Sequence, residues 1–209
     1  MYKLVRAGQY YAIVHDERPM RSPLGRPYLT GFRLLAEDLC EDLNRFGPFG
    51  SGATLHAAYL DHGRKAPRTH RESWLLMRYD PALDFALDRP QDRTGAAMMT
   101  AWFGPVISLE KLSAWLRAAS LRQLVSMVVA ASVSCSVLVA HRLLRGELPA
   151  TRLAAGMRKW ERPGADDVAE LTLTLDNIRR YAQAPDEPEL IAATPFELDA
   201  TVQGVAQRH

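Results

Sequence analysis

The chain has 209 residues, of which 47% are hydrophobic and 24% charged, a composition typical of a globular protein that excludes an intrinsically disordered chain. This length suits one large domain or two small ones with a buried core. The formal net charge of +2 is too small to indicate nucleic-acid or membrane-surface binding by itself.

The first thirty residues are predicted to form short strands. Residues 10–14 are rich in aromatic and β-branched side chains, and Asp16-Glu17 follows as a turn. Residues 18–21 and 27–30 are the next two strands, separated by the turn Pro23-Leu24-Gly25. The pattern predicts a small antiparallel sheet, which is stable only when one of its faces is covered.

The cover for this sheet is expected to be the helix that follows. Leucines and a phenylalanine recur at helical spacing over residues 34–46, with acidic residues on the opposite side, and Gly47 ends the pattern. Residues 48–52 are predicted to be a loop and residues 54–61 a short helix. The basic segment 62–71, broken by proline and glycine, is interpreted as a linker.

Helical periodicity dominates the rest of the chain. The predicted helices cover residues 72–79, 94–103, 108–119, 121–145, 150–161 and 166–183. The uncharged stretch 124–140 is shorter than the roughly 20 apolar residues of a membrane span and contains four serines. It is therefore predicted to be a core helix rather than a membrane span, and its small residues indicate close packing against neighbouring helices.

These elements predict an α+β protein with a small antiparallel β-rich N-terminal domain followed by an all-helical C-terminal domain. The expected boundaries are 1–63 for the β-rich domain with its covering helix, 64–184 for the helical bundle and 185–209 for a tail. Two alternatives stay open for the tail. It is either disordered or docked as an arm through Leu190, Ile191, Phe196 and Leu198.

The sequence contains no motif typical of catalysis. His56, Asp61, His62 and His70 could supply metal ligands, but no two have the spacing of an H-E-x-x-H pair, so neither a metal site nor another cofactor is predicted. Cys40 lies among four acidic residues, which would raise the pKa of its thiol, and Cys135 lies in the most apolar predicted helix. Nucleophile-elbow and phosphate-binding glycine motifs are missing as well. We therefore predict that the protein is not an enzyme.

The expected location is the cytoplasm. Two cysteines are too few for a disulfide framework, which favours a reducing compartment. The first eight residues contain no apolar region typical of a signal peptide. Nucleic-acid binding by the basic linker is not expected either, because that segment has no aromatic residue for base stacking.

Several stretches, taken in order, resemble the ATP synthase alpha-subunit assembly chaperones (the "ATP twelve" family). YAIVHDERPMRSPLGRPYL at 11–29 is similar to the strand, turn and Gly-x-Pro-Leu return that open the family, and LLAEDL at 34–39 to its Leu-Ala-Glu helix. TLHAAYLD at 54–61 and the serine-rich apolar stretch before Gly146-Glu147-Leu148 match later segments. Trp160, Gly164 and Asp166 stand where the family has its tryptophan-containing motif.

The resemblance implies a cofactor-independent chaperone that holds the unassembled alpha subunit of the ATP synthase head. It marks Trp160, Arg158, Lys159 and Glu161 as partner-binding residues. The chain departs from the family there, because Met157, Arg158 and Lys159 replace acidic residues, so the identity of the client is left open.

Two alternatives to this prediction stay open. Trp160 could pack in the bundle core, with Arg158 and Lys159 forming a solvated helix end. A small-molecule-binding protein or enzyme with a pocket between the two domains, served by His56, Asp61 and His62, is the other reading of the function.

Overall fold

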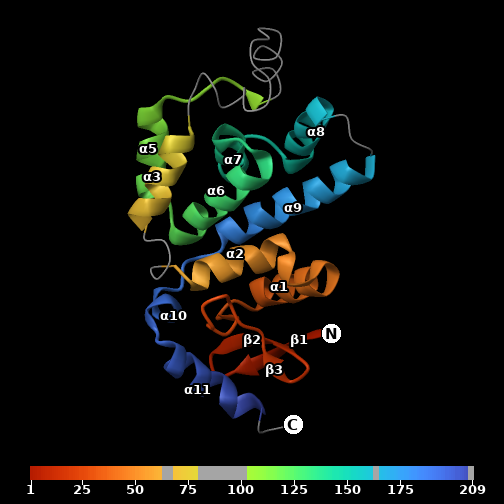
Figure 1. The fold of residues 1–209 in the computed structure, drawn as a ribbon, viewed down its shortest axis with the longest axis vertical. Coiled ribbons are helices and arrows are strands. Elements are labelled where there is room, and N and C mark those ends of the chain that lie inside the picture. Colours follow the sequence, from red (N-terminus) through yellow and green to blue (C-terminus); the bar gives the residue numbers. More distant parts are fainter. Residues whose placement is uncertain (63–67, 80–102, 162–164, 207–209) are drawn as a thin grey trace. The chain divides into compact units, whose positions relative to one another are not determined.

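A computed structural model describes residues 1–62, 68–79, 103–161 and 165–206 (Figure 1). The chain divides into two compact units. Unit 1 consists of Met1–Pro67 together with Ala184–His209, and unit 2 is Arg68–Gln183. Unit 1 contains the predicted antiparallel sheet and the described part of unit 2 is helical, which confirms the predicted α+β class.

The sheet of unit 1 has four short antiparallel strands. These are β1 (Tyr2–Ala7), β2 (Tyr10–His15), β3 (Arg18–Pro19) and β4 (Leu29–Thr30). β2 pairs with the other three strands. The turn between β2 and β3 places Asp16 and Glu17 at φ 49° and 62°, the left-handed conformation that tight two-residue hairpins require. The turn predicted at these two residues is thus confirmed.

Helix α1 (Arg33–Phe46) covers the sheet, as the sequence predicted. Its buried face carries Leu35, Leu39 and Leu43, and it packs against β1, β2 and β4. A short 3-10 turn η1 (Gly47–Phe49) leads into α2 (Ser51–Leu60), which begins three residues before its predicted start.

The C-terminal segment of unit 1 forms two helices, α10 (Pro188–Ala192) and α11 (Pro195–Ala206). Leu190, Leu198 and Val202 are buried, so the segment is docked, although as helices rather than as an extended arm. Phe196, one of its predicted anchors, is 83% exposed.

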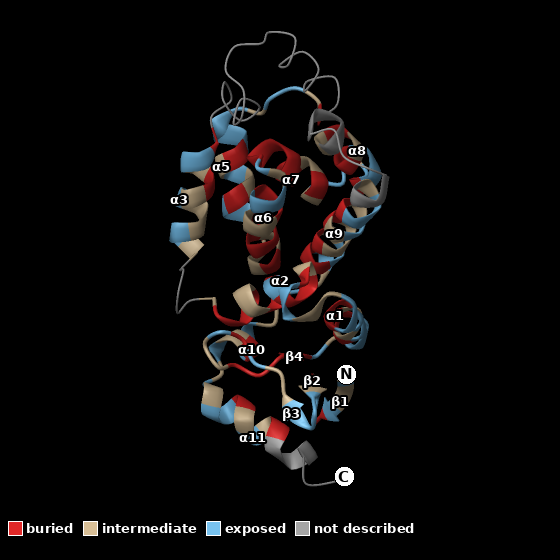
Figure 2. Cartoon of the chain, turned by 45° about the vertical axis from the view of Figure 1, so that its right-hand side comes forward, coloured by how far each residue is buried: buried red, intermediate tan, exposed pale blue. Residues whose placement is uncertain are grey.

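Unit 2 contains the helices α3 (Arg68–Arg78), α5 (Leu109–Ala118), α6 (Leu121–Ser134), α7 (Val137–Leu144), α8 (Ala150–Glu161) and α9 (Ala165–Gln183). Helix α6 packs against α3, α7 and α9, and α9 turns its buried side toward it (Figure 2). The central position predicted for this serine- and alanine-rich stretch is therefore correct. None of the described helices combines the length and the apolar character that crossing a bilayer needs.

The single helix predicted over residues 121–145 is wrong, because the chain breaks into α6 and α7 at Cys135. Cys135 has φ 53°, and Ser136 caps α7 by accepting a hydrogen bond from Val139 N at 3.2 Å. The Ser134 hydroxyl bonds back to Ala130 O at 2.7 Å, which offers the backbone an alternative to the helical ladder. The helix predicted over residues 94–103 lies outside the described residues apart from Phe103.

Candidate functional site

The four residues predicted to bind a partner all lie in the last turn of α8. The backbone of Arg158, Lys159, Trp160 and Glu161 is helical, and the bounds of α8 are those predicted from the sequence. Their side chains are outside what the structure describes. Their role in binding therefore stays a proposal.

His56 and Asp61, the candidates for a metal site or a pocket, have structural partners in unit 1. His56 is buried, and its Nε2 lies 3.0 Å from Leu29 O, so this nitrogen donates a hydrogen bond to the strand carbonyl. Asp61 accepts hydrogen bonds from Ser22 Oγ at 2.5 Å and from Leu24 N at 3.2 Å. Both side chains hold the β3–β4 connection and β4 against α2. Across the described part of the chain, no three His, Cys, Asp or Glu residues are grouped to hold a metal ion.

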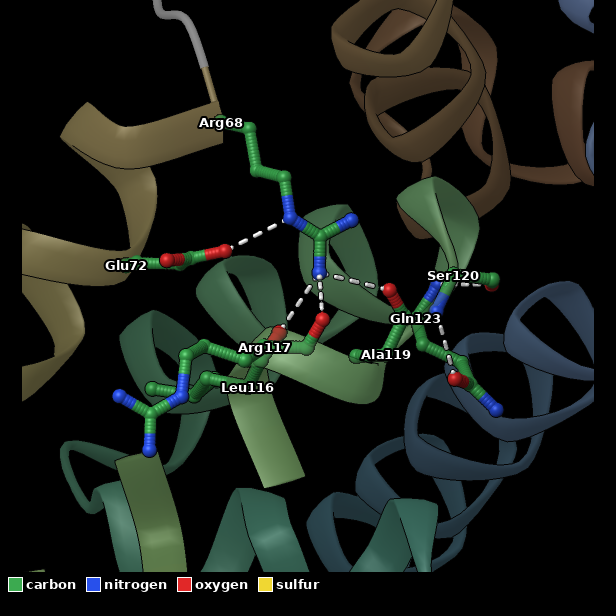
Figure 3. Close-up of polar contacts among 7 residues, drawn as sticks. All are labelled: Arg68, Glu72, Leu116, Arg117, Ala119, Ser120 and Gln123. Atoms are coloured by element: carbon green, nitrogen blue, oxygen red, sulfur yellow. Dashed lines mark hydrogen bonds and ion pairs between the residues drawn. The ribbon is translucent and has the colours of Figure 1, made fainter. Parts of the chain in front are cut away.

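Arg68, from the predicted linker, is the first residue of α3, and its guanidinium holds a helix end (Figure 3). Its Nη2 donates to the carbonyls of Leu116, Arg117 and Ala119 at 2.7, 2.9 and 2.8 Å, and its Nε donates to Glu72 at 2.7 Å. Carbonyls in the last turn of a helix have no intrahelical donor, so a cation is favoured there. The positive charge of Arg68 is therefore balanced within unit 2, by the Glu72 carboxylate and the carbonyls at the end of α5.

Neither cysteine has the surroundings of a reactive thiol. Burial raises the pKa of the half-buried Cys40. The sequence predicted a raised pKa as well, but attributed it to the neighbouring acidic residues. Cys135 is exposed at the break between α6 and α7, so its predicted place inside an apolar helix is wrong. The structure therefore gives no support to either cysteine as an activated nucleophile.

His141 is a buried titratable group in the core of unit 2. It is 6% exposed and packs edge-on against Trp115, with ring centroids 5.2 Å apart. Burial lowers the pKa of His141 from 6.5 to about 4, with Arg142 and Arg145 acting in the same direction and Glu147 opposing them. The imidazole is therefore neutral in the folded protein at pH 7.

We expect the stability of unit 2 to fall when the pH is lowered from 7 to 5. The unfolded chain binds a proton at His141 near pH 6.5, while the folded chain does so only near pH 4. The neutral His141 therefore contributes its full stabilisation above pH 6.5, and this contribution is lost progressively as the pH falls from 6.5 toward 4. The expected loss by pH 5 is about 2 kcal/mol in the free energy of unfolding. All four tryptophans lie in unit 2, so urea unfolding followed by tryptophan fluorescence measures this unit.

The control for this experiment is His141→Gln, which removes the titrating group. The variant is less stable at both pH values, but its free energy of unfolding is expected to change little between pH 7 and 5. Equal pH dependence in the variant and the natural protein would exclude His141 as the source.

Large apolar side chains are exposed on the described surface of both units. Leu34, Phe49 and Phe196 are exposed on unit 1, and Met77, Val106 and Leu109 on unit 2. The unit 2 residues were not among the predicted partner-binding residues. Three apolar residues follow one another at 75–77, and helical periodicity alone does not decide which of them faces outward. Exposed apolar clusters are typical of surfaces that bind other proteins.

No family model matches the sequence, and no curated protein is similar to it. Solved structures with a similar fold include those of two proteins. One is Atu1473, a candidate chaperone from Agrobacterium tumefaciens, with TM-score 0.57 and 15% identity over 87% of this chain and 81% of that chain. The other is Atp12 from Paracoccus denitrificans, with TM-score 0.53 and 15% identity over 87% of this chain and 93% of that chain. The resemblance seen in the sequence is thus confirmed at the level of the fold.

Proposed function

We propose that this chain, which shares the fold of Atp12 from Paracoccus denitrificans, is an assembly chaperone that holds the unassembled alpha subunit of the ATP synthase head. The shared fold, which extends over 87% of this chain, carries the proposal. The exposed apolar side chains of unit 2, Met77, Val106 and Leu109, support a protein-binding role. Against the enzyme alternative, His56 and Asp61 are already bonded to the backbone and side chains of unit 1.

A holder of this kind needs no cofactor and no nucleophile. An unassembled subunit exposes apolar surface that later lies in an interface, and such surface makes a protein prone to aggregate. A chaperone that binds only the unassembled form stabilises it by mass action and is displaced when the true partner binds more tightly. Specificity then depends on the contact residues of the chaperone.

We assign a contact role to Trp160, Arg158, Lys159 and Glu161 at the end of α8. Tryptophan and arginine dominate the binding energy of many protein interfaces, because they combine a large apolar area with polar or charged groups. The basic pair would favour an acidic segment on the client. The alternative, in which Trp160 packs in the core, predicts a loss of stability rather than a loss of binding.

Trp160→Ala is expected to weaken binding of the purified alpha subunit by at least tenfold, since truncating a central interface tryptophan typically costs about 2 kcal/mol or more. Binding would be measured by calorimetry, with thermal melting of each variant to detect loss of stability. Phe196→Ala is the control, because it truncates another aromatic side chain, one that is exposed and lies in unit 1. If Trp160→Ala melts earlier yet binds normally, Trp160 is a core residue. If the natural protein does not bind the alpha subunit, the proposed client is wrong.

A further inference from the structure

The segment between Phe103 and α5 has its backbone fixed from two sides. The Tyr79 hydroxyl donates to Ile107 O at 2.6 Å and accepts from Ile107 N at 3.1 Å. On the other side, Arg142 Nη2 donates to Pro105 O at 2.6 Å. Arg142 is itself ion-paired with Glu147. The segment is thus held by side chains of α7 and of the residue that follows α3.

These bonds gather exposed apolar residues at one end of the α3–α5 pair. The two helices run antiparallel, because Arg68 at the start of α3 bonds the end of α5 while Tyr79, after α3, bonds Ile107 just before α5 (Figure 1). Met77 and Leu109 each lie two residues from the Tyr79–Ile107 bonds, and they are 78% and 51% exposed. We call Met77, Pro105, Val106 and Leu109 the α3–α5 end surface.

Among the described residues, cations outnumber anions around this surface. Arg78 follows Met77 and lies over the ring of Trp74 at 5.0 Å, and Lys111 is in the first turn of α5 near Glu110. Arg142 and Arg145 are both ion-paired with the same carboxylate, that of Glu147. Counted over these described side chains, the rim of the α3–α5 end surface carries more positive than negative charge.

We propose that the α3–α5 end surface binds an apolar segment of the alpha-subunit client that carries aspartate or glutamate beside its apolar residues. This inference rests on the proposed function and adds a contact surface that is separate from the last turn of α8. A backbone fixed in advance loses little entropy on binding. The flexible thioether of Met77 adapts to apolar side chains of different shapes. The positive rim selects acidic flanks and speeds the encounter.

The test is binding of purified alpha subunit to the double variant Met77→Ser/Leu109→Ser of the full chain. We expect the dissociation constant to rise at least tenfold, as for the loss of a central apolar contact. The matched control is Leu34→Ser/Phe196→Ser, which removes two apolar side chains of comparable exposure from unit 1 and is expected to bind like the natural protein. Since all four side chains are exposed, the melting temperatures should change little.

A single variant, Lys111→Glu, tests the charge complementarity. It is expected to slow association several-fold and to reduce the dependence of the association rate on salt. Normal binding by Met77→Ser/Leu109→Ser would overturn the inference while the proposed function stands. Failure of the natural protein to bind the alpha subunit would overturn the function and, with it, the occupant assigned to this surface.

Discussion

Replacing Arg26 by alanine is expected to release the C-terminal helices from the rest of unit 1. Arg26 is 1% exposed, and its guanidinium donates to the carbonyls of Leu190, Ile191 and Ala193 at 2.6, 3.1 and 2.8 Å. These carbonyls belong to the end of α10, where the backbone lacks intrahelical donors. Alanine leaves them without this donor and leaves a cavity, so we expect a loss of about 3 kcal/mol.

Hydrogen exchange detected by mass spectrometry would show where the loss falls. Peptides from residues 185–206 should exchange on the order of a hundredfold faster in Arg26→Ala, because local opening sets their exchange rate. Peptides from α6 and α7 in unit 2 should be unchanged.

Two variants separate the role of the buried guanidinium from that of charge alone. Arg26→Lys keeps the charge but replaces the fork with one ammonium, so an intermediate effect is expected. Arg21→Ala breaks the partly exposed ion pair with Asp199, at 2.8 Å, and should cost less than about 1 kcal/mol. Equal effects of Arg26→Ala and Arg21→Ala would contradict the proposed anchoring.

The place of Arg26 could not be predicted from the sequence. It lies between a Pro-Leu-Gly turn and Pro27, a position typical of an exposed loop, and its partner Leu190 is 164 residues away. The turn itself is readable, because proline and glycine act through local backbone geometry. Asp61 fixes this turn by accepting hydrogen bonds from Ser22 and Leu24, and the fixed turn places Arg26. These contacts depend on tertiary packing, which local sequence patterns do not show.

Local patterns predicted the helices well and their interruptions poorly. Apolar periodicity and proline or glycine breaks located α1, α5, α8 and α9 to within one residue at each end. The break at Cys135 has neither proline nor glycine, and it depends on hydroxyl bonds from Ser134 and Ser136 that composition alone does not reveal.

The roles of the candidate site residues could not be predicted from local patterns either, because they depend on tertiary contacts. His56 and Asp61 have the side chains that metal ions bind, but the fold pairs them with a strand carbonyl and a turn. The exposure of Met77 depends on which side of α3 faces the bundle, and Leu75 occupies that side. The tryptophan segment was found only through family resemblance, since no local pattern distinguishes a contact tryptophan from a core one.

The start of α2 carries an unusual cap. Gly50 precedes the helix and has no side chain with which to cap it, and Asp42 from α1 accepts the hydrogen bond of Ala53 N at 3.2 Å instead. A carboxylate at a helix N-terminus satisfies a free amide and interacts favourably with the helix dipole. Asp42 approaches so closely that a Cβ on Gly50 would lie 2.9 Å from its Cγ.

Gly50→Ala is therefore expected to destabilise unit 1 by about 3 kcal/mol, through overpacking and the loss of the Asp42 cap. Backbone strain is not the cause, because Gly50 has φ −57° and ψ 153°, which alanine adopts freely. Hydrogen exchange of residues 51–60 would measure the effect. In the Asp42→Ala background the carboxylate is gone, and the same Gly50→Ala change should cost less than about 0.5 kcal/mol. A coupling energy of at least about 2 kcal/mol in this double-mutant cycle is the expected result, and simple additivity would mean that the carboxylate does not restrict Gly50.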